Sequence, residues 1–162
     1  MTRYAGTIAK LVTVPEAIEW RRAHRGAVVF TNGVFDLLHT GHVEYLEAAR
    51  ALGSALVVAV NNDASARSLG KGPGRPFVAA ADRARLVAAL AAVDRVVLFS
   101  EPTPLALIEA LSPDILVKGG DYTRDTVVGA DWVEGRGGKV VLIPVVAGQS
   151  TTSIVERIRG SS

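Results

Sequence analysis

The sequence TNGVFDLLHTGH, which occupies residues 31–42, is the deciding stretch for the architecture of this chain. It continues directly from an apolar run over Ala27–Thr31 and leads into an alanine- and leucine-rich segment over Gly41–Leu52. A short β-branched run that turns at a glycine into such a segment is typical of a strand–turn–helix unit in a parallel sheet. Because ligands of these sheets bind beyond the carboxyl ends of the strands, a functional site is expected at this turn.

The remainder of the chain repeats this alternation of strands and helices. Short, nearly continuous apolar runs are typical of strands that are covered on both faces. The pattern therefore predicts an α/β fold, a Rossmann-like, doubly wound, five-stranded parallel sheet with helices on both faces. The further expected strands are Ala55–Asn61, Arg95–Phe99, Asp114–Val117 and Lys139–Ile143, the expected helices are Pro15–His24, Gly41–Leu52, Ala80–Ala92, Pro104–Leu111, Val127–Gly135 and Thr151–Arg159, and the expected irregular loops are Asn61–Pro76 and Lys118–Thr126.

Length and composition narrow the class of protein. A chain of 162 residues fits one domain, which we expect to consist of an N-terminal helical extension over 1–26 and a Rossmann-like core over 27–162. The absence of cysteine excludes disulfides, iron–sulfur clusters and thiol catalysis. A net charge of +2 predicts neither a nucleic-acid nor a membrane surface. No secretory signal or membrane-length apolar run is present, so a cytoplasmic protein is expected.

Two histidines stand three residues apart at the end of the deciding stretch. If the helix begins here, His39 and His42 lie on the same side of its N-terminus, with Gly41 between them. Two hydrogen-bond donors beside the positive end of a helix dipole form a phosphate-binding site. Zinc ligation and a purely structural role are the alternatives. His24 is the only other histidine, and the chain has no cysteine. Asp36 alone would therefore not complete a closed zinc site around His39 and His42.

Basic residues also occur in the loop after the second expected strand. Lys71 and Arg75 stand among glycine and proline, which suits a lid that carries positive charge over a triphosphate. A solvated surface loop is the alternative. Arg83, at the start of the next helix, is either an ordinary exposed residue or a further phosphate contact.

Two more segments follow strands and carry polar groups. Lys118, Gly119, Gly120 and Asp121 come at the end of the fourth strand, where a tight glycine turn with an exposed lysine is the plain alternative. Hydroxyl groups crowd the start of the last helix, where they form either an N-cap or an anion cradle. This second segment comprises Gly148, Gln149, Ser150, Thr151 and Thr152.

The stretch Asn32–His42 resembles the first signature of the cytidylyltransferase-like nucleotidyltransferases, and Ser150–Val155 resembles their second signature. This resemblance implies the strand order 3-2-1-4-5. It also implies that His39, His42 and Lys71 are catalytic, and that Asp36, Asn62 and Asp63 are candidates for contact with the acceptor substrate. The nucleotide-binding residues that it implies are Val34, Phe35, Gly41, Arg75, Lys118, Gly119, Gly120, Asp121, Gly148, Gln149, Ser150, Thr151 and Thr152.

Within this family, the segment Val28–Ile158 is most similar to the heptose 1-phosphate adenylyltransferases. The resemblance implies that AMP is transferred from ATP to D-glycero-β-D-manno-heptose 1-phosphate, with release of pyrophosphate and formation of ADP-heptose for lipopolysaccharide core or other heptose glycans. It further implies Mg²⁺ held mainly through the phosphates of ATP, no metal site made by the protein, and a homo-oligomer, most simply a dimer. Ile18 and Trp20 could form such an interface or pack on the chain's own sheet.

Two alternative functions stay open from the sequence. One is a cytidylyltransferase that acts on glycerol 3-phosphate or another phospho-alcohol, and the other is a nucleotide-binding module without catalysis. Glycerol-3-phosphate cytidylyltransferases carry an arginine where this chain reads Val145-Val146-Ala147, and two lysines where it has Lys71 and Arg75. Both departures favour the adenylyl alternative, for which an apolar Val145-Val146 surface would suit adenine.

Overall fold

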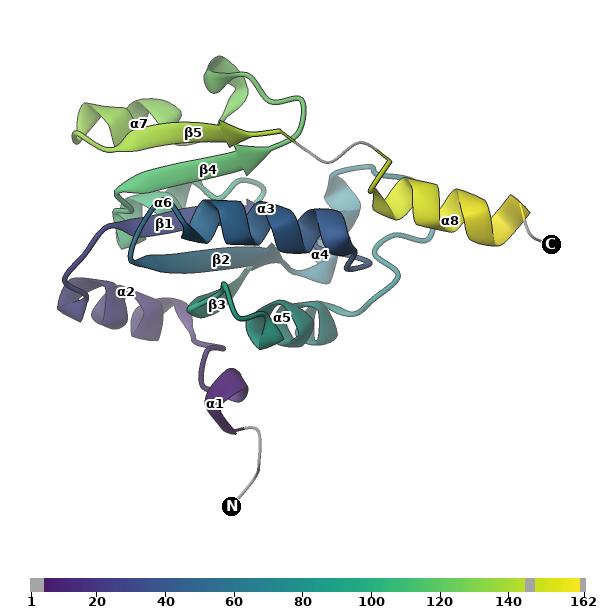
Figure 1. The fold of residues 1–162 in the computed structure, drawn as a ribbon, viewed down its shortest axis with the longest axis horizontal. Helices are drawn as coiled ribbons and strands as arrows, with labels where there is room; N and C mark the ends of the chain where they lie inside the picture. The colour runs from purple at the N-terminus through teal and green to yellow at the C-terminus, as the bar shows by residue number, and fades with distance from the viewer. Residues whose placement is uncertain (1–4, 145–147, 161–162) are drawn as a thin grey trace.

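Five parallel strands form the centre of the molecule, and the carboxyl ends of all five lie at one edge (Figure 1). The structure, a computed structural model, describes residues 5–144 and 148–160. The sheet has the order β3-β2-β1-β4-β5, which confirms the predicted fold class and strand order. The strands are β1 (Val28–Gly33), β2 (Ala55–Asn61), β3 (Arg95–Phe99), β4 (Ile115–Gly119) and β5 (Lys139–Ile143).

Helices cover both faces of the sheet because alternate strand residues point to opposite sides. Phe30, Val57 and Leu116 pack into one apolar cluster with residues of α2, α6 and α7. Val29 and Val58 pack into a second cluster with residues of α3 and α5. The helices are α1 (Ala5–Ile8), α2 (Val14–Ala23), α3 (Thr40–Arg50), α4 (Asp63–Ser68), α5 (Ala80–Ala89), α6 (Leu105–Leu111), the 3₁₀ turn η1 (Arg124–Thr126), α7 (Ala130–Gly135) and α8 (Thr151–Gly160).

The N-terminal segment packs against the sheet. Leu11 forms a parallel bridge to Val96, so this segment pairs with the outer edge of β3. Thr13 begins α2 with a capping box in which its side chain accepts a hydrogen bond from the backbone of Glu16. Ile18 and Trp20 then pack against the chain's own core. Of the two possibilities left open by the sequence, packing on the sheet is therefore the one found for these side chains.

The expected elements are found, with corrections at their ends. The loop expected over Asn61–Pro76 is wrong in part, because it contains the short helix α4. The side chain of Asn62 accepts a hydrogen bond from the backbone N–H of Ser65 and so begins this helix. β4 continues beyond the expected Asp114–Val117 as far as Gly119, which brings Lys118 into the sheet itself.

The amino edge of the sheet is stabilised by two carboxylates. Asp114 accepts a hydrogen bond from the backbone N–H of Val28 at 2.7 Å, which joins β4 to β1. Asp94 accepts one from Leu56 at 2.8 Å, which joins β3 to β2. At the opposite edge, where the strands end, the polar groups face a cleft instead.

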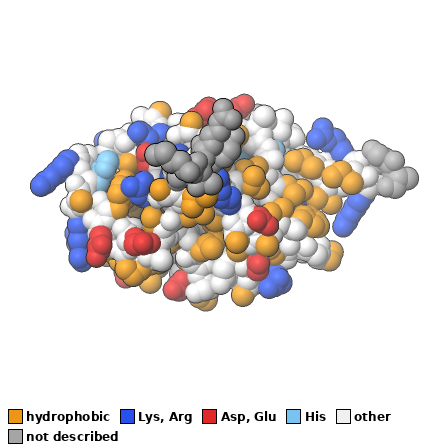
Figure 2. All heavy atoms as spheres, turned by 90° about the horizontal axis from the view of Figure 1, so that it is seen from below, with side chains coloured by type: hydrophobic (Ala, Val, Ile, Leu, Met, Phe, Trp, Pro, Cys, Tyr) orange, Lys and Arg blue, Asp and Glu red, His pale blue; other side chains and the backbone are white. Residues whose placement is uncertain are grey.

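The surface seen from below carries mixed charge. Figure 2 shows lysine and arginine side chains scattered among acidic and apolar ones on this face, rather than gathered into one patch. Within residues 5–144 and 148–160, none of the helices has the length and apolar character to cross a bilayer.

Candidate active site at the carboxyl edge of the sheet

A cleft of about 870 Å³ lies across the carboxyl ends of the strands. Its walls come from the β1–α3 turn, the loop between α4 and α5, the end of β4 and the start of α8. A volume of this size falls in the range of small-molecule and cofactor sites. The lining residues are Asn32, Gly33, Val34, Phe35, His39, Gly41, His42, Tyr45, Asn61, Leu69, Lys71, Arg75, Pro102, Thr103, Pro104, Lys118, Gly119, Tyr122, Thr126, Val128, Gln149, Ser150, Thr151 and Thr152.

The two histidines of the deciding stretch lie together in this cleft. The rings of His39 and His42 stack with 3.9 Å between their centroids, and the ring of Phe35 lies 5.4 Å from that of His42. Phe35 has φ +50°, a left-handed conformation that costs a non-glycine residue roughly 1–2 kcal/mol. The buried position of its ring against His42 fits a strained turn whose purpose is to place the histidines.

The cleft favours the neutral form of both histidines. Burial, followed by the charges of His39 and Lys71, lowers the pKa of His42 to about 4. Burial also lowers the pKa of His39. The Nδ1 atoms of both rings are buried without a hydrogen-bond partner. We therefore expect the proton on Nε2 of each ring, where it can be donated to a phosphate oxygen.

The zinc alternative lacks ligands in the described part of the chain. His24 lies away from the pair, with its Nε2 atom 2.8 Å from Ser54 Oγ. Within residues 5–144 and 148–160, no three His, Cys, Asp or Glu side chains are grouped so that they could hold a metal ion. The pair consequently lacks the further protein ligands that a closed zinc site requires.

Gly41 allows α3 and α8 to approach each other. A Cβ atom on Gly41 would lie 3.0 Å from the ring of His39 and 3.0 Å from Cβ of Gln149. The hydroxyl of Thr151 donates a hydrogen bond to the backbone oxygen of Leu37 at 3.4 Å. Two helix N-termini, those of α3 and α8, therefore meet at the same end of the cleft, which suits a polyanion.

The hydroxyl groups at the start of α8 have two kinds of role. Ser150 and Ser153 exchange backbone-to-side-chain hydrogen bonds, which is the N-cap arrangement. Ser150, Thr151 and Thr152 all line the cleft. Ser150 therefore caps the helix and also contributes, with the two threonines, to the wall of the cleft.

Lys118 reaches into the cleft from the end of β4. Its Nζ donates a hydrogen bond to the backbone oxygen of Asn32 at 3.2 Å and lies 5.1 Å from the centre of the Tyr122 ring. Burial, with a smaller contribution from Lys71, lowers the pKa of Lys118 to about 8. The alternative of an exposed lysine in a tight turn is therefore wrong. Gly119 lies against the ring of Tyr45, which a Cβ atom would approach to 2.8 Å.

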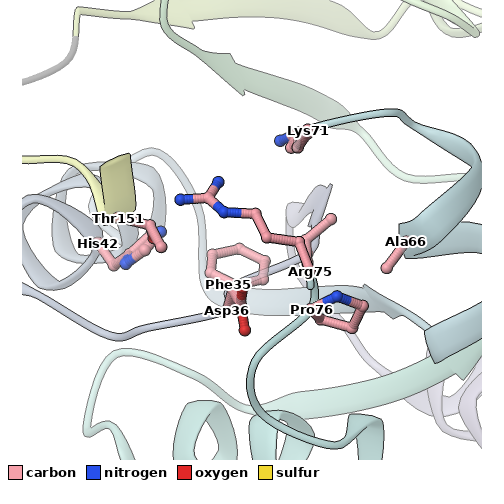
Figure 3. Close-up of a pocket in the computed structure, with 9 residues that line it drawn as sticks. Phe35, Asp36, His42, Ala66, Lys71, Arg75, Pro76 and Thr151 are labelled. Carbon is pink, nitrogen blue, oxygen red and sulfur yellow. The ribbon is translucent and has the colours of Figure 1, made fainter. Parts of the chain in front are cut away.

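Lys71 and Arg75 line a smaller pocket of about 70 Å³ together with His42. Figure 3 shows the Arg75 guanidinium extending from its loop toward Thr151 and His42. Desolvation and the nearby Arg75 charge lower the pKa of Lys71. Asp36, which shares this pocket, is 5 % exposed. Two cations thus stand at the site where the two helix N-termini meet.

Several predicted site residues lie away from the cleft wall. Asn62 caps α4, and Asp63 pairs with Arg83 at 2.8 Å. Gly120, Asp121 and Gly148 are not among the lining residues, although Gly120 follows the lining Gly119 directly and Gly148 precedes Gln149. The apolar surface expected at Val145-Val146-Ala147 lies outside the described residues.

Sequence reasoning missed Arg83 and three aromatic or apolar parts of the wall. Arg83 has no exposed surface and does not line the cleft, so neither predicted alternative for it is correct. Its four hydrogen bonds go to other protein groups. A helical spacing of apolar residues around Arg83 could have indicated its burial. The missed lining residues include Tyr45, Tyr122 and the Pro102–Pro104 segment, which carry no motif.

Among the described residues, no group of side chains forms a magnesium site of its own. In that part of the chain the lining of the large cleft contains no carboxylate, and Asp36 lines the small pocket. Mg²⁺ prefers carboxylate, phosphate and water oxygens. An ion in this cleft would therefore be held by phosphate oxygens of the bound nucleotide, and we assign no reaction step to it.

Comparison with known proteins places this geometry in a family. The family model described as cytidylyltransferase-like matches residues 30–157. The chain is 55 % identical over 155 residues to the bifunctional protein HldE of Syntrophotalea carbinolica. This alignment covers 96 % of this chain and 31 % of that protein. It is 63 % identical over 131 residues to HldE of Magnetococcus marinus, which covers 81 % of this chain and 27 % of that protein. The chain thus spans less than a third of the length of these relatives.

Solved structures show the same fold. The lipopolysaccharide core biosynthesis protein of Thermoplasma volcanium is 31 % identical and aligns with a TM-score of 0.61. The alignment covers 75 % of this chain and 98 % of that one. A pantoate-β-alanine ligase of Francisella tularensis, 14 % identical, aligns over 92 % of this chain and 76 % of its own with a TM-score of 0.61 and supports the fold alone. With the family model matching most of its length, this chain belongs to the cytidylyltransferase-like family.

Proposed function

We propose that this chain is a nucleotidyltransferase that transfers AMP from ATP to D-glycero-β-D-manno-heptose 1-phosphate. The products are ADP-heptose and pyrophosphate, and the ADP-heptose serves lipopolysaccharide core or other heptose glycan synthesis. Identity of 55–63 % to bifunctional HldE proteins supports this assignment. Because the chain matches under a third of each of those proteins, we assign it to their adenylyltransferase part, the part that the nucleotidyltransferase signatures indicate.

One observation carries the proposal. The stacked histidine pair, two helix N-termini and three cationic side chains converge on a single cleft. The described lining contains no carboxylate that would repel a polyphosphate. This arrangement of donors and positive charge is what a nucleoside triphosphate requires. The cations are Lys71, Arg75 and Lys118.

The reaction that this geometry supports is a direct, in-line displacement. A phosphate oxygen of the sugar phosphate attacks the α-phosphorus of ATP, a new P–O bond forms, and the bond to the β-phosphate oxygen breaks. The electron pair leaves with pyrophosphate. No protein nucleophile is needed because the attacking phosphate is already anionic, so the protein supplies position and charge neutralisation.

Different residues of the cleft are assigned to different phosphates of ATP. We assign His39 and His42 to the α- and β-phosphates, since their Nε2 atoms are the expected donors. Thr151 and Thr152 bind the β/γ region, and Lys71 with Arg75 closes on the phosphates from the opposite side. Magnesium bound to those phosphates supplies further charge neutralisation.

The nucleoside is assigned to the end of β4. The half-buried Lys118, the backbone of Gly119 and the exposed ring of Tyr122 form that side of the cleft. Gly120 and Asp121 follow directly along the chain and are proposed to touch the ribose. Among the candidates for acceptor contact, only Asp36 faces a pocket with the two cations, whereas Asn62 and Asp63 are engaged in α4 and its contact to α5.

Pyrophosphate release tests the assignment against its alternatives. ATP and CTP are each combined with heptose 1-phosphate and with glycerol 3-phosphate. The proposal predicts release that is fastest with ATP and heptose 1-phosphate. Preferred release with CTP and glycerol 3-phosphate would show a cytidylyltransferase. Absence of release in all four mixtures, together with nucleotide binding, would leave a non-catalytic binding module.

We further propose that the enzyme acts as a homodimer in the cytoplasm, where ATP and sugar phosphates are available. Ile18 and Trp20 do not supply the interface, because they pack against the chain's own core. Helix α8 has no buried residue, and its apolar Ile154 and Val155 are partly exposed, so we assign the contact with a second copy to this helix. Light scattering coupled to size exclusion, with Ile154→Glu as the variant, tests this: the variant should be monomeric.

A further inference from the structure

We propose that Asp36 and Arg83 form a clamp that positions Lys71 and Arg75 over the histidine pair. The clamp deepens the function proposed above and rests on it, since its purpose is to complete the same site. Neither residue is assigned a direct contact with the substrate in this role. Both act through the loop that bears the two cations.

The first half of the clamp is the buried carboxylate of Asp36. Its Oδ1 atom accepts hydrogen bonds from the backbone N–H groups of Phe77 and Val78, at 2.8 and 3.0 Å. Asp36 is 5 % exposed and follows Phe35, whose ring packs against His42. The turn that places the histidines is thereby tied to the end of the loop that carries the cations.

The second half is the guanidinium of Arg83, which has no exposed surface. Its Nε donates to the backbone oxygen of Val78 at 2.8 Å. Its Nη1 donates to the backbone oxygens of Val34 at 2.6 Å and Asn61 at 2.9 Å, and its Nη2 pairs with Asp63. One side chain therefore joins the histidine turn, the end of β2, the start of α4 and the loop.

Val78 is the point at which the two halves meet. Asp36 holds its N–H and Arg83 holds its C=O, so this peptide position is fixed from both sides. Within the described part of the chain, no backbone–backbone hydrogen bond joins residues 71–76 to the rest of the protein. The loop between α4 and α5 is thus held at its α4 end and at the clamp, and Lys71 and Arg75 lie between these two anchors.

The charge of Asp36 adds to this positioning. Its Oδ2 atom is buried without a hydrogen-bond partner and belongs to the side chain that lines the small pocket with Lys71 and Arg75. A carboxylate there attracts the two cations toward the histidine side of the pocket. The clamp therefore combines a hydrogen-bonded anchor with a local electrostatic attraction.

Three variants and a control separate the clamp from a direct substrate contact. Asp36→Asn keeps an oxygen that can accept both N–H groups but removes the charge. Asp36→Ala removes both the accepting oxygen and the charge. Arg83→Lys removes the guanidinium group, whose N–H groups reach the four acceptors. Asp82→Asn is the control, because Asp82 is an exposed carboxylate in the first turn of the same helix as Arg83.

Two readouts are used, one of which needs no substrate. Trypsin cleavage after Lys71, followed by mass spectrometry, reports how firmly the loop is held. The clamp predicts cleavage about ten-fold faster in Asp36→Ala and in Arg83→Lys. Asp36→Asn should lie between the wild type and Asp36→Ala, because it keeps the hydrogen-bonded anchor and loses the charge. The clamp also predicts that kcat falls about a hundred-fold in Asp36→Ala, with the KM for the sugar phosphate nearly unchanged. Asp82→Asn should match the wild type in both readouts.

A different pattern would overturn the clamp. If cleavage after Lys71 stays at the wild-type rate in all variants while the KM for the sugar phosphate rises equally in Asp36→Asn and Asp36→Ala, Asp36 contacts the substrate directly. Where Asp36→Ala does not fold, Asp36→Asn and Arg83→Lys decide through the same cleavage comparison. Since cleavage is measured without substrate, a wild-type protein that releases no pyrophosphate refutes the proposed function and still leaves the clamp testable.

Discussion

At the residue scale, the site contains side chains whose pKa values are shifted by burial in the cleft. His42 is neutral at pH 7 because burial lowers its pKa to about 4, and Lys118 is only partly protonated near pH 8 because burial lowers its pKa to about 8. Both shifts arise because burial in the unliganded protein removes water from the charged forms of these side chains. A bound polyphosphate would compensate for that loss, which is typical of a binding site.

Replacement of His42 by alanine should reduce kcat by at least about a hundred-fold, since one donor to the developing charge is lost. The melting temperature should change by only a few degrees because the ring lies at the cleft wall. His24→Ala is the matched control, since His24 contacts Ser54 away from the site, and it should keep full activity. Near-normal turnover in His42→Ala would remove His42 from the mechanism.

The affinity for ATP should depend on pH through Lys118. The ammonium form of Lys118 is complete well below pH 8 and is lost in the free protein as the pH rises through about 8. The negative charge of bound ATP favours the ammonium form, so ATP affinity should fall above pH 8, by up to about ten-fold per pH unit. Calorimetric titration between pH 7 and 9.5 measures this. Lys118→Met should bind more weakly and with a flatter pH profile; an equally steep profile in that variant would contradict the assignment.

At the element scale, the site depends on how closely α3 and α8 approach each other. Gly41 lies in the first turn of α3 against the ring of His39 and the side chain of Gln149. The sequence indicated a phosphate site here because a glycine stood between two histidines after a strand. It did not indicate the backbone contact from Thr151 to Leu37, because that contact joins residues more than a hundred positions apart.

Gly41→Ala should lower kcat by about ten- to a hundred-fold, because the new methyl group would lie 3.0 Å from the His39 ring and displace it. Stability should fall little, since alanine favours a helix more than glycine does. Gly135→Ala in α7 is the control, as nothing lies within 4 Å of its Cβ position. A Gly41→Ala enzyme with wild-type kcat would show that the close approach of the helices is not required.

At the scale of the whole molecule, the two edges of the sheet have different tasks. The carboxyl edge holds the cleft, and the amino edge holds structural carboxylates such as Asp114 and Asp94. The strand order and the place of the cleft could be predicted because apolar runs and glycine turns are local features. The burial of Arg83 could not, because its four acceptors lie on the β1–α3 turn, at the end of β2, at the start of α4 and in the loop before α5.

Asp114→Ala should separate stability from activity. It removes the hydrogen bond to the Val28 N–H and the ion pair with Arg21, of which the backbone bond is the larger contribution because Asp114 is partly exposed. The free energy of unfolding should fall by about 2 kcal/mol, which lowers the melting temperature by roughly 4–8 °C. Thermal denaturation and pyrophosphate assays below the transition measure the two effects. A loss of kcat at unchanged stability would contradict this division between the edges.

Transfer of the α-phosphorus of ATP to the sugar phosphate is the defining step of the proposed reaction. The most direct measurement uses ATP labelled with ³²P at the α-position, incubated with the protein and heptose 1-phosphate, with the products separated by chromatography. The proposed reaction predicts that the label moves to ADP-heptose at the rate at which pyrophosphate appears, with none bound to the protein. Label that remains in ATP, appears as free AMP or becomes attached to the protein would contradict it.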